Sequence, residues 1–356
     1  MASHMETVTS PLPIRNPKRQ RRRAGVAVPF MAFFVIVIAA ACGKARGQTV
    51  RIAIGGQTQL VYLPTTLAQE LGFYRDEGLN VELEDFAGGS KALQALMGGS
   101  ADVVSGFYDH TIQMQAEGRD VVSFVSMLRF PGLVLVTSPQ AADAVTKIAD
   151  LSGRIAGVTT AGSSSQLLFT YLLHRNGIAA DAVSVTAIGN AATAVAAIEH
   201  GRVDAGMMTD PAFTLLLRRN PRVRVLADLR HAEGVKREFG SDTYPASVLY
   251  AKGDWIRANR ETAHRLARAI VRTLDWMQMH SPQNIADKTP AGFRGDDPAL
   301  YVDALKSSMP MFSPDGRMAA DGAESVRALL AASMDTVRSA KIDVAKTYTN
   351  EFVNGR

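Results

Sequence analysis

Four short loops rich in glycine, serine and threonine carry residue types that suit the binding of a small molecule. They are Gly55-Gly56-Gln57-Thr58-Gln59, Gly88-Gly89-Ser90, Ala161-Gly162-Ser163-Ser164-Ser165 and Met208-Thr209-Asp210-Pro211. In the second and third loops, glycine permits a close backbone approach, and serine adds a hydroxyl beside free amides at the start of a helix, which suits an anion. Serine and glycine are also ordinary helix caps. Because four such loops recur, we predict that they meet in one cleft and bind a ligand. The candidate ligand-binding residues in the first three loops are Gln57, Thr58, Gln59, Gly88, Gly89, Ser90, Gly162, Ser163, Ser164 and Ser165.

Six larger polar side chains lie next to these loops or next to the segments that we expect to join two lobes: Tyr62, Tyr108, Asp109, Arg129, Asp210 and Tyr244. A tyrosine can stack on or cap a ligand, or pack as a half-buried aromatic residue. The two aspartates can receive an ammonium group, and Asp210-Pro211 can equally be only a helix start. Arg129 pairs either with an anionic ligand or with a carboxylate of the other lobe. The sequence leaves these alternatives open, and all six are candidate ligand-binding residues.

The sequence lacks the residue constellations of several enzyme classes. It has no Walker phosphate loop, no G-x-S-x-G turn and no H-E-x-x-H helix. His110, His174 and His200 are scattered, and nothing in the sequence joins them to Ser163–Ser165 as a triad. With Cys42 as the single cysteine, neither an internal disulfide nor a cysteine-based metal site can form. We therefore predict a protein without catalytic residues, cofactor or metal.

The charge of the chain is concentrated at its N-terminus. The 356 residues have a formal net charge of +5. Residues 1–41 hold six basic side chains and a single acidic one, which leaves 33 basic and 33 acidic residues from Cys42 onward. A protein that binds nucleic acid needs a basic surface on its folded body. We therefore expect no nucleic acid among the partners.

The same N-terminal part has the order of a secretory signal. The basic cluster Lys18–Arg23 precedes the apolar stretch Ala24–Ala41, small residues and Cys42. A retained membrane helix is the alternative, because 18 mostly apolar residues are near the minimum that spans a bilayer. The residues before Cys42 resemble a bacterial lipoprotein site, and a competing cleavage site follows Gly47. We take residues 1–48 as a signal segment, with a tag remnant at 1–4.

Beyond the signal segment, short apolar runs alternate with longer amphipathic stretches, which is typical of an α/β fold. The first expected elements are Val50–Ile54, Tyr62–Glu77, Leu79–Leu83, Ser90–Met97 and Val103–Ser105. The same order returns as Arg154–Val158, Ser164–Asn176, Val183–Ala187, Ala191–His200 and Asp204–Met208. At an offset of 102 residues, Ala92, Ala95, Gly99 and Asp102 align with Ala194, Ala197, Gly201 and Asp204. We infer two similar doubly wound lobes, each with a parallel sheet.

The chain continues past the second copy with one strand, Ala246–Tyr250, and then with long amphipathic helices such as Arg260–Met279 and Asp321–Ser339. A single strand followed by helices does not make a third lobe, so we expect it to return to the first. The predicted lobe 1 comprises 49–133 and 247–356, and lobe 2 comprises 134–246. Two extended crossings, Leu133–Ser138 and Thr243–Val248, then form a hinge, and the cleft between the lobes can close.

Residues from Val50 to Tyr348 resemble the substrate-binding proteins of bacterial ABC importers with the type II periplasmic fold. The similar branch serves nitrate, taurine, alkanesulfonates and thiamine-pyrimidine precursors. The resemblance is carried by Arg51–Ile54, Leu71–Leu83, Gly88–Ser90, Gly98–Val103 and Leu151–Gly157. It implies a cleft lined after the first strand, at the glycine-serine turn, around Tyr108, at Ser163–Ser165 and around Asp210. It also implies a membrane permease as partner, no chemistry, and a periplasmic location, or a lipid anchor on the outer face of a membrane if Cys42 is modified.

The resemblance leaves the ligand open. Relatives that synthesise pyrimidines use a site rich in cysteine and histidine, which this chain lacks, and no acidic cluster for a metal-dependent anion site can be assembled. We expect a monomer that binds a small organic anion, such as a sulfonate or a carboxylate. Replacing Ser164 and Ser165 by alanine should then weaken binding with little change in the stability of the free protein. Binding of a thiamine-pyrimidine precursor, an enzyme on the same fold and a ligand-sensing receptor domain are the alternatives.

Overall fold

The structure is a computed structural model that describes residues 49–353. The signal segment predicted for residues 1–48, with Cys42, lies outside the described residues. Within 49–353, no helix combines the length and the apolarity that crossing a membrane requires.

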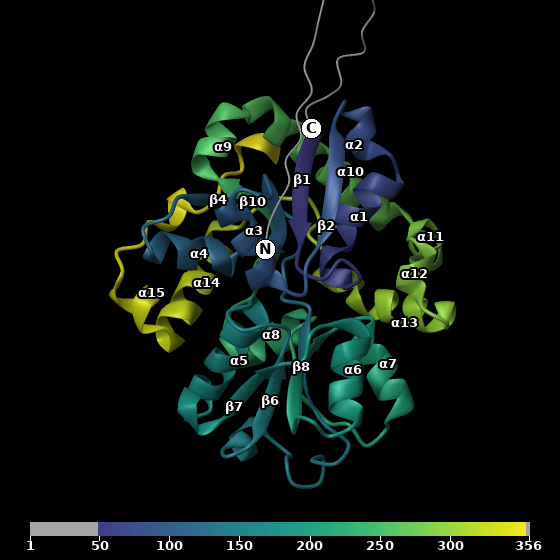
Figure 1. The fold of residues 1–356 in the computed structure, drawn as a ribbon, viewed down its shortest axis with the longest axis vertical. Helices are drawn as coiled ribbons and strands as arrows, with labels where there is room; N and C mark the ends of the chain where they lie inside the picture. Colours follow the sequence, from purple (N-terminus) through teal and green to yellow (C-terminus); the bar gives the residue numbers. More distant parts are fainter. Residues whose placement is uncertain (1–48, 354–356) are drawn as a thin grey trace, which may run out of the picture. The chain divides into compact units, whose positions relative to one another are not determined.

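Two five-stranded sheets with equivalent topology form the centre of the described part (Figure 1). The first has the order β2-β1-β3-β10-β4 and the second the order β7-β6-β8-β5-β9. The first comprises β1 (Thr49–Ile54), β2 (Asn80–Asp85), β3 (Val103–Phe107), β4 (Val121–Ser126) and β10 (Ser247–Lys252). The second comprises β5 (Leu133–Thr137), β6 (Ile155–Val158), β7 (Ser184–Ala187), β8 (Ala205–Thr209) and β9 (Val225–Asp228). The predicted fold class, two similar α/β lobes, is confirmed. Lobe 1 here means the first sheet with its helices, and lobe 2 the second.

One strand of each sheet arrives from the other lobe and runs antiparallel to its neighbours. These strands are β10, between β3 and β4, and β5, between β8 and β9. The sheets are therefore mixed, where the sequence pattern predicts parallel ones. The segments that cross between the lobes lie side by side, because Tyr244 N–H donates to the carbonyl of Arg129 at 3.0 Å and Ala246 N–H donates to that of Leu128 at 3.2 Å. This pairing makes the two-segment hinge.

Helices from both ends of the described chain surround the first sheet. The first group is α1 (Leu63–Glu70), α2 (Phe73–Asp76), α3 (Gly89–Gly98) and α4 (Asp109–Ala116). The second is α9 (Gly253–Ala258), α10 (Arg260–Met279), α11 (Pro282–Lys288), α12 (Ala291–Arg294), α13 (Pro298–Ser308), α14 (Ala320–Ser333) and α15 (Asp335–Ser339). The long helix α10 packs on α1, α2 and β4. The single helix expected over 62–77 is broken at Gly72, whose φ of 78° is a left-handed conformation that favours glycine.

The second sheet separates two hydrophobic cores, because successive residues of a strand point to opposite faces. Its helices are α5 (Ser164–Arg175), α6 (Ala191–Glu199), α7 (Ala212–Arg219) and α8 (Ala232–Phe239). In β5, Val134 and Val136 share a core with Phe213 of α7. Leu135, between them, belongs to the larger core that contains Leu168 of α5. The sheet is thus covered on both faces, as in a doubly wound fold.

The repeat in the sequence corresponds to a repeated contact at the amino ends of the strands. In lobe 1, Arg51 of β1 pairs with Asp102 at 3.0 Å, and the Arg51 backbone N–H donates to the same carboxylate at 2.9 Å. In lobe 2, Arg154 pairs with Asp204 at 3.4 Å, and Ile155 N–H donates to Asp204 at 2.9 Å. The first pair fixes β1 beside the start of β3, and the second fixes β6 beside the start of β8. The offset of 102 residues therefore relates equivalent positions.

Candidate functional site

A small closed cavity lies where the carboxyl ends of the strands of both sheets meet. Its volume is about 20 Å³, which is enough for roughly one water molecule. The walls from lobe 1 and the hinge are Gly55, Gln59, Val61, Tyr62, Gly89, Phe107 and Leu133. The walls from lobe 2 are Thr159, Ser163, Ser164, Ser165 and Thr209. Both lobes therefore contribute polar groups to a single enclosed space.

Side chains of the two lobes hydrogen-bond directly to each other around this cavity. Ser90 Oγ, at the start of α3, donates to the carbonyl of Ala161 at 2.8 Å and lies 2.9 Å from Thr160 Oγ1. On another side, Thr209 Oγ1 donates to Gln59 Oε1 at 2.8 Å. These bonds leave little space between the lobes, so the structure shows the cleft in a closed state.

The three serines at the start of α5 have different roles. Ser163 Oγ donates to the carbonyl of Thr160 at 2.7 Å, and Ser165 Oγ accepts the N–H of Thr159 at 3.0 Å. Both hydroxyls therefore hold the shape of their own loop. Ser164 Oγ instead reaches lobe 1 and donates to Asp109 Oδ1 at 2.7 Å. Replacing Ser164 would thus remove a partner from a buried carboxylate.

Asp109, the first residue of α4, is fully buried beneath the cavity. Apart from Ser164, its side chain has the hydroxyl of Tyr244 at 3.5 Å from Oδ2. Burial raises the pKa of Asp109, and the neighbouring His110 and the hydrogen bonds oppose this shift. Across residues 49–353, no lysine or arginine forms an ion pair with it. The site thus holds a carboxyl group that has two hydroxyls and His110 as neighbours and, in the described part of the chain, no lysine or arginine partner.

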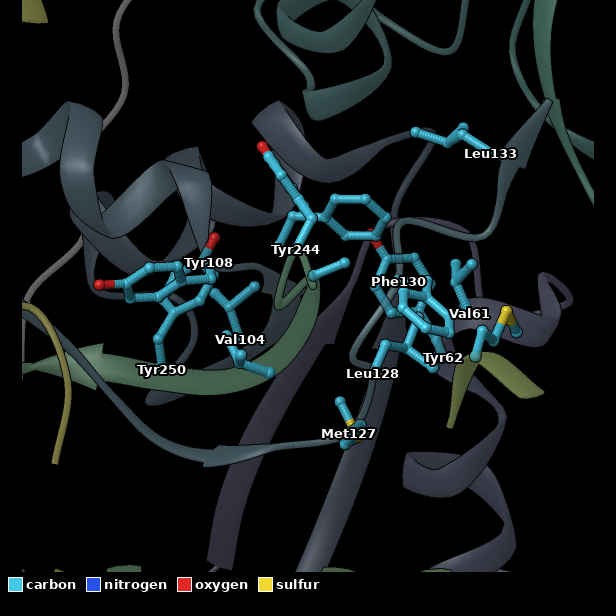
Figure 2. Packing of buried hydrophobic residues seen from close by; sticks show 14 of the residues in the cluster. Val61, Tyr62, Val104, Tyr108, Met127, Leu128, Phe130, Leu133, Tyr244 and Tyr250 are labelled. Atoms are coloured by element: carbon cyan, nitrogen blue, oxygen red, sulfur yellow. The ribbon is translucent and has the colours of Figure 1, made fainter. Parts of the chain in front are cut away.

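Aromatic rings surround this carboxyl group. Tyr62 lines the cavity, and its ring meets that of Phe107 edge to face with centroids 6.1 Å apart. Burial and the negative charge of Asp109 both raise the pKa values of Tyr62 and Tyr244. Figure 2 shows Tyr62 and Tyr244 within the same buried cluster as Leu133. The aromatic walls of the cavity therefore lie close to one carboxyl group, which contacts the wall residue Ser164.

Eleven of the sixteen predicted ligand-binding residues lie at or beside the cavity. Six line it: Gln59, Tyr62, Gly89, Ser163, Ser164 and Ser165. Five others contact those walls or the seam between the lobes: Gly88, Ser90, Asp109, Gly162 and Tyr244. At Gly88 the lobes approach so closely that an added Cβ would lie 2.5 Å from Thr160 Oγ1. Glycine is thus required there for closure.

Four of the predicted ligand-binding residues lie away from the cavity. Gln57 Nε2 donates to Thr66 at 3.2 Å, and the adjacent Thr58 is half-buried without lining the cavity. The hydroxyl of Tyr108 lies 2.5 Å from Thr347 Oγ1. Neighbouring residues at a helix start point in different directions, so Asp109 lies beneath the cavity and Tyr108 does not. Arg129 is exposed and donates to the carbonyl of Pro310 at 3.0 Å, which leaves it outside the site.

Asp210, the fifth, is occupied by protein partners. Its carboxylate pairs with Arg230 at 2.9 Å and accepts hydrogen bonds from Thr214 Oγ1 at 2.6 Å and from Ser308 Oγ at 2.9 Å. Its carbonyl accepts the N–H of Leu60 at 2.9 Å. Ser308 and Leu60 belong to lobe 1, so Asp210 joins the lobes and has no oxygen left for a ligand ammonium.

Sequence reasoning missed several walls of the cavity. Thr209 and Gly55 lie in loops that the sequence singled out, but neither was among the predicted ligand-binding residues. Thr159 directly follows β6, and Phe107 is the last residue of β3. Their position at a strand end is the signal that could have identified them. Within 49–353, no three histidine, cysteine or acidic side chains are grouped to hold a metal ion.

Comparisons with known proteins agree with this architecture. A family model described as NMT1/THI5 like matches residues 59–285. A solved structure of a Bordetella bronchiseptica RB50 protein is 40% identical, with a TM-score of 0.82, and the match covers 86% of this chain and 95% of that one. The alkanesulfonate-binding protein SsuA of Xanthomonas axonopodis pv. citri, solved bound to MOPS, is 18% identical, with a TM-score of 0.67 and coverage of 86% and 99%.

A relative named as a binding protein, YtlA of Bacillus subtilis (strain 168), is 22% identical over 295 residues, which are 80% of this chain and 83% of that protein. The family match extends over more than half of the chain. The shared fold and the family support a solute-binding role. The chain thus belongs to the NMT1/THI5-like family.

Proposed function

We propose that the protein is the extracytoplasmic solute-binding component of an ABC importer, and that its lobes close on a small molecule for delivery to a membrane permease. The observation that carries the proposal is the cavity at the carboxyl ends of two equivalent sheets, enclosed by polar groups of both lobes. Ligands of open α/β sheets bind at that end. A hinge of two adjacent crossings allows the lobes to separate and close again.

Binding fits the groups around the cavity better than catalysis does. An activated serine nucleophile needs a base within hydrogen-bond distance. Ser163 and Ser165 are bonded to their own loop, and Ser164 donates to Asp109. Among the described residues, no hydrogen bond joins a serine of this loop to a histidine. We therefore infer that the solute leaves unchanged.

The small organic anion stays a prediction about the ligand. It depends on free helix starts at Ser90 and at Ser163–Ser165. In the closed state these starts contact each other, since Ser90 bonds to Ala161. Between the lobes lies the carboxyl group of Asp109, and the cavity walls hold no lysine or arginine. These charges argue against a sulfonate or a carboxylate.

The predicted leader belongs to the same proposal, because a binding protein coupled to a permease works outside the cytoplasm. Cleavage near residue 48 releases the body, whereas lipidation of Cys42 anchors it. The intact mass of the exported protein distinguishes the two. The boundaries 49–133 plus 247–356 and 134–246, and the monomeric state, are further parts of the proposal.

Native mass spectrometry of the gently purified, exported protein tests the proposed function. We expect a complex with one intact small molecule per chain, which denaturation releases and which the protein then rebinds. Loss of uptake of that molecule in cells without the protein would link it to import. Conversion of the molecule into a product over repeated cycles would contradict the binding role, and so would a protein that carries and rebinds nothing.

A further inference from the structure

The charge around the closed cavity is unbalanced. Asp109 is completely buried, and its closest partner is a neutral hydroxyl, that of Ser164 at 2.7 Å. A buried carboxylate is stable only when a cation or several hydrogen-bond donors compensate its charge. The second hydroxyl, that of Tyr244, is 3.5 Å away, which is a weak contact. His110 adds a backbone N–H and the favourable charge interaction of its imidazole, and no lysine or arginine within 49–353 pairs with the carboxyl group. The described protein therefore supplies only part of the compensation.

Ser164 comes from lobe 2, whereas Asp109 belongs to lobe 1. A cavity of about 20 Å³ cannot hold an organic molecule, so the lobes must separate to admit one. Opening moves α5 away from α4 and removes the Ser164 hydrogen from Asp109. A donor on the solute can then take the position of that hydrogen. The best replacement is a positively charged N–H group, because it also compensates the charge.

The walls beside Asp109 suit the remainder of such a molecule. Tyr62 and Phe107 present aromatic surface to the cavity, and Val61 and Leu133 add apolar surface. Aromatic rings attract a cation through the negative face of the ring. Tyr62 also has a hydroxyl for which no hydrogen-bond partner within 49–353 is seen, and this hydroxyl can accept an N–H from the solute. The aromatic faces and the carboxyl group of Asp109 thus favour a cation.

We propose that the cleft binds a protonated organic amine with a small apolar or aromatic body, and that Asp109 is the counter-ion of its ammonium group. This inference rests on the proposed solute-binding function and names the class of solute. It assigns the ammonium to Asp109 and the body to the surface of Tyr62, Phe107 and Leu133. Asp210, the other predicted ammonium partner, is already neutralised by Arg230.

Three probes with one aromatic body test the charge: benzylammonium, benzyl alcohol and benzenesulfonate, each titrated into the purified protein at pH 7. Binding is measured by calorimetry and by saturation-transfer NMR. We expect benzylammonium to bind at least about tenfold more tightly than the other two. Asp109→Asn should weaken its binding at least about tenfold. Asp102→Asn is the matched control, because Asp102 lies at the opposite end of β3 and pairs with Arg51.

The comparison among the probes needs no variant, so it remains decisive if Asp109→Asn folds poorly. Tightest binding of benzenesulfonate would overturn the ammonium assignment and leave solute binding intact. Binding of benzylammonium that Asp109→Asn does not weaken would also overturn it. If none of the three binds, the assignment fails, while native mass spectrometry separately decides whether the protein binds a solute.

Discussion

Asp109 and Asp210 are two buried carboxyl groups that follow equivalent strands of the two lobes, β3 and β8. Asp109 is the second residue after β3 and the first of α4, whereas Asp210 is the first residue after β8 and the second before α7. Asp210 pairs with Arg230, which also pairs with Asp228 at 2.6 Å and lies over the ring of Phe213 at 4.6 Å. Asp109 pairs with no lysine or arginine among the described residues, and its charged neighbour there is His110.

The difference separates a structural carboxylate from one available to a ligand. In lobe 2 the chain supplies its own cation and uses Asp210 to hold Leu60 and Ser308 of lobe 1. In lobe 1, Asp109 has two hydroxyls and His110 as partners, and the hydroxyl of Ser164 moves away when the lobes separate. A charged residue in a cleft is therefore informative only together with its partners.

The largest expected effect is that of Arg230→Met, which leaves Asp210 and Asp228 without a cation. Breaking a buried pair by removing one partner costs about 3–5 kcal/mol. We expect a loss of this size in the free energy of unfolding, measured by urea titration. Arg218→Met is the control, because Arg218 pairs with Asp297 on the exposed surface, where a pair contributes about 1 kcal/mol or less. Equal losses in both variants would contradict the structural role of Asp210.

Ser164→Ala tests the partner of the unpaired carboxyl group. The hydrogen bond to Asp109 is worth about 1.5–3 kcal/mol when the acceptor is charged. The stability lost in the variant is smaller than this, because water reaches Asp109 when the cleft opens. We expect the free protein to lose about 1 kcal/mol or more, whereas the sequence alone predicts little change in stability when Ser164 and Ser165 are both replaced. Ser184→Ala, at an exposed serine of β7, should be neutral. Unfolding curves that do not separate the two variants would refute the importance of this bond.

Gly88→Ala should prevent full closure of the lobes. The added Cβ would lie 2.5 Å from Thr160 Oγ1, and overpacking of this kind costs about 1–3 kcal/mol. Small-angle X-ray scattering of the ligand-free variant should give a larger radius of gyration than the wild type. The control is Gly98→Ala at the far end of α3, the helix that Gly88 precedes, where an added Cβ meets nothing within 4 Å. An unchanged radius for Gly88→Ala would show that the lobes do not approach here in solution.

Asp109→Asn should stabilise the ligand-free protein at neutral pH. Because burial raises the folded-state pKa of Asp109, the folded protein favours the neutral acid. The wild type therefore loses stability as the pH rises above the pKa of about 4 that aspartate has in the unfolded chain. Each pKa unit of the shift corresponds to about 1.4 kcal/mol. The variant should therefore be more stable against unfolding than the wild type at pH 7, and this difference in stability should disappear towards pH 4.

Several titratable groups face Asp109, and the wild type and the Asp109→Asn variant share all of them. Tyr62, Tyr244 and Tyr250 remain protonated because burial raises their pKa values, and His110 is retained. Thermal unfolding from pH 4 to pH 8 measures the difference in stability between the variant and the wild type. A variant less stable than the wild type at pH 7 would show that Asp109 is already compensated within the protein.

The sequence predicted the lobes well because their signals are local. Apolar runs marked the strands, and the repeated Asp102 and Asp204 marked equivalent positions. The direction of β10 and β5 was missed, because it depends on the path between the lobes. The break at Gly72 was also missed, since helix periodicity continues past it.

The roles of single site residues were harder to predict, because they depend on distant partners. Asp210 is neutralised by Arg230, 20 residues further on, and bonded to Ser308, 98 residues further on. Tyr108 is drawn to Thr347, 239 residues away. Gly, Ser and Thr near strand ends were better guides, since any residue there faces the same edge of the sheet.

The most direct test of the central claim is the distance between the lobes with and without solute. Nitroxide labels at Gln94→Cys on α3 and Arg202→Cys after α6, both exposed, report this distance by pulsed electron paramagnetic resonance in a Cys42→Ser background. The proposal predicts that the free protein samples a longer distance. It also predicts that the solute identified by native mass spectrometry leaves only the shorter, closed distance. A single distribution that the solute leaves unchanged would contradict a cleft that opens and closes on its ligand.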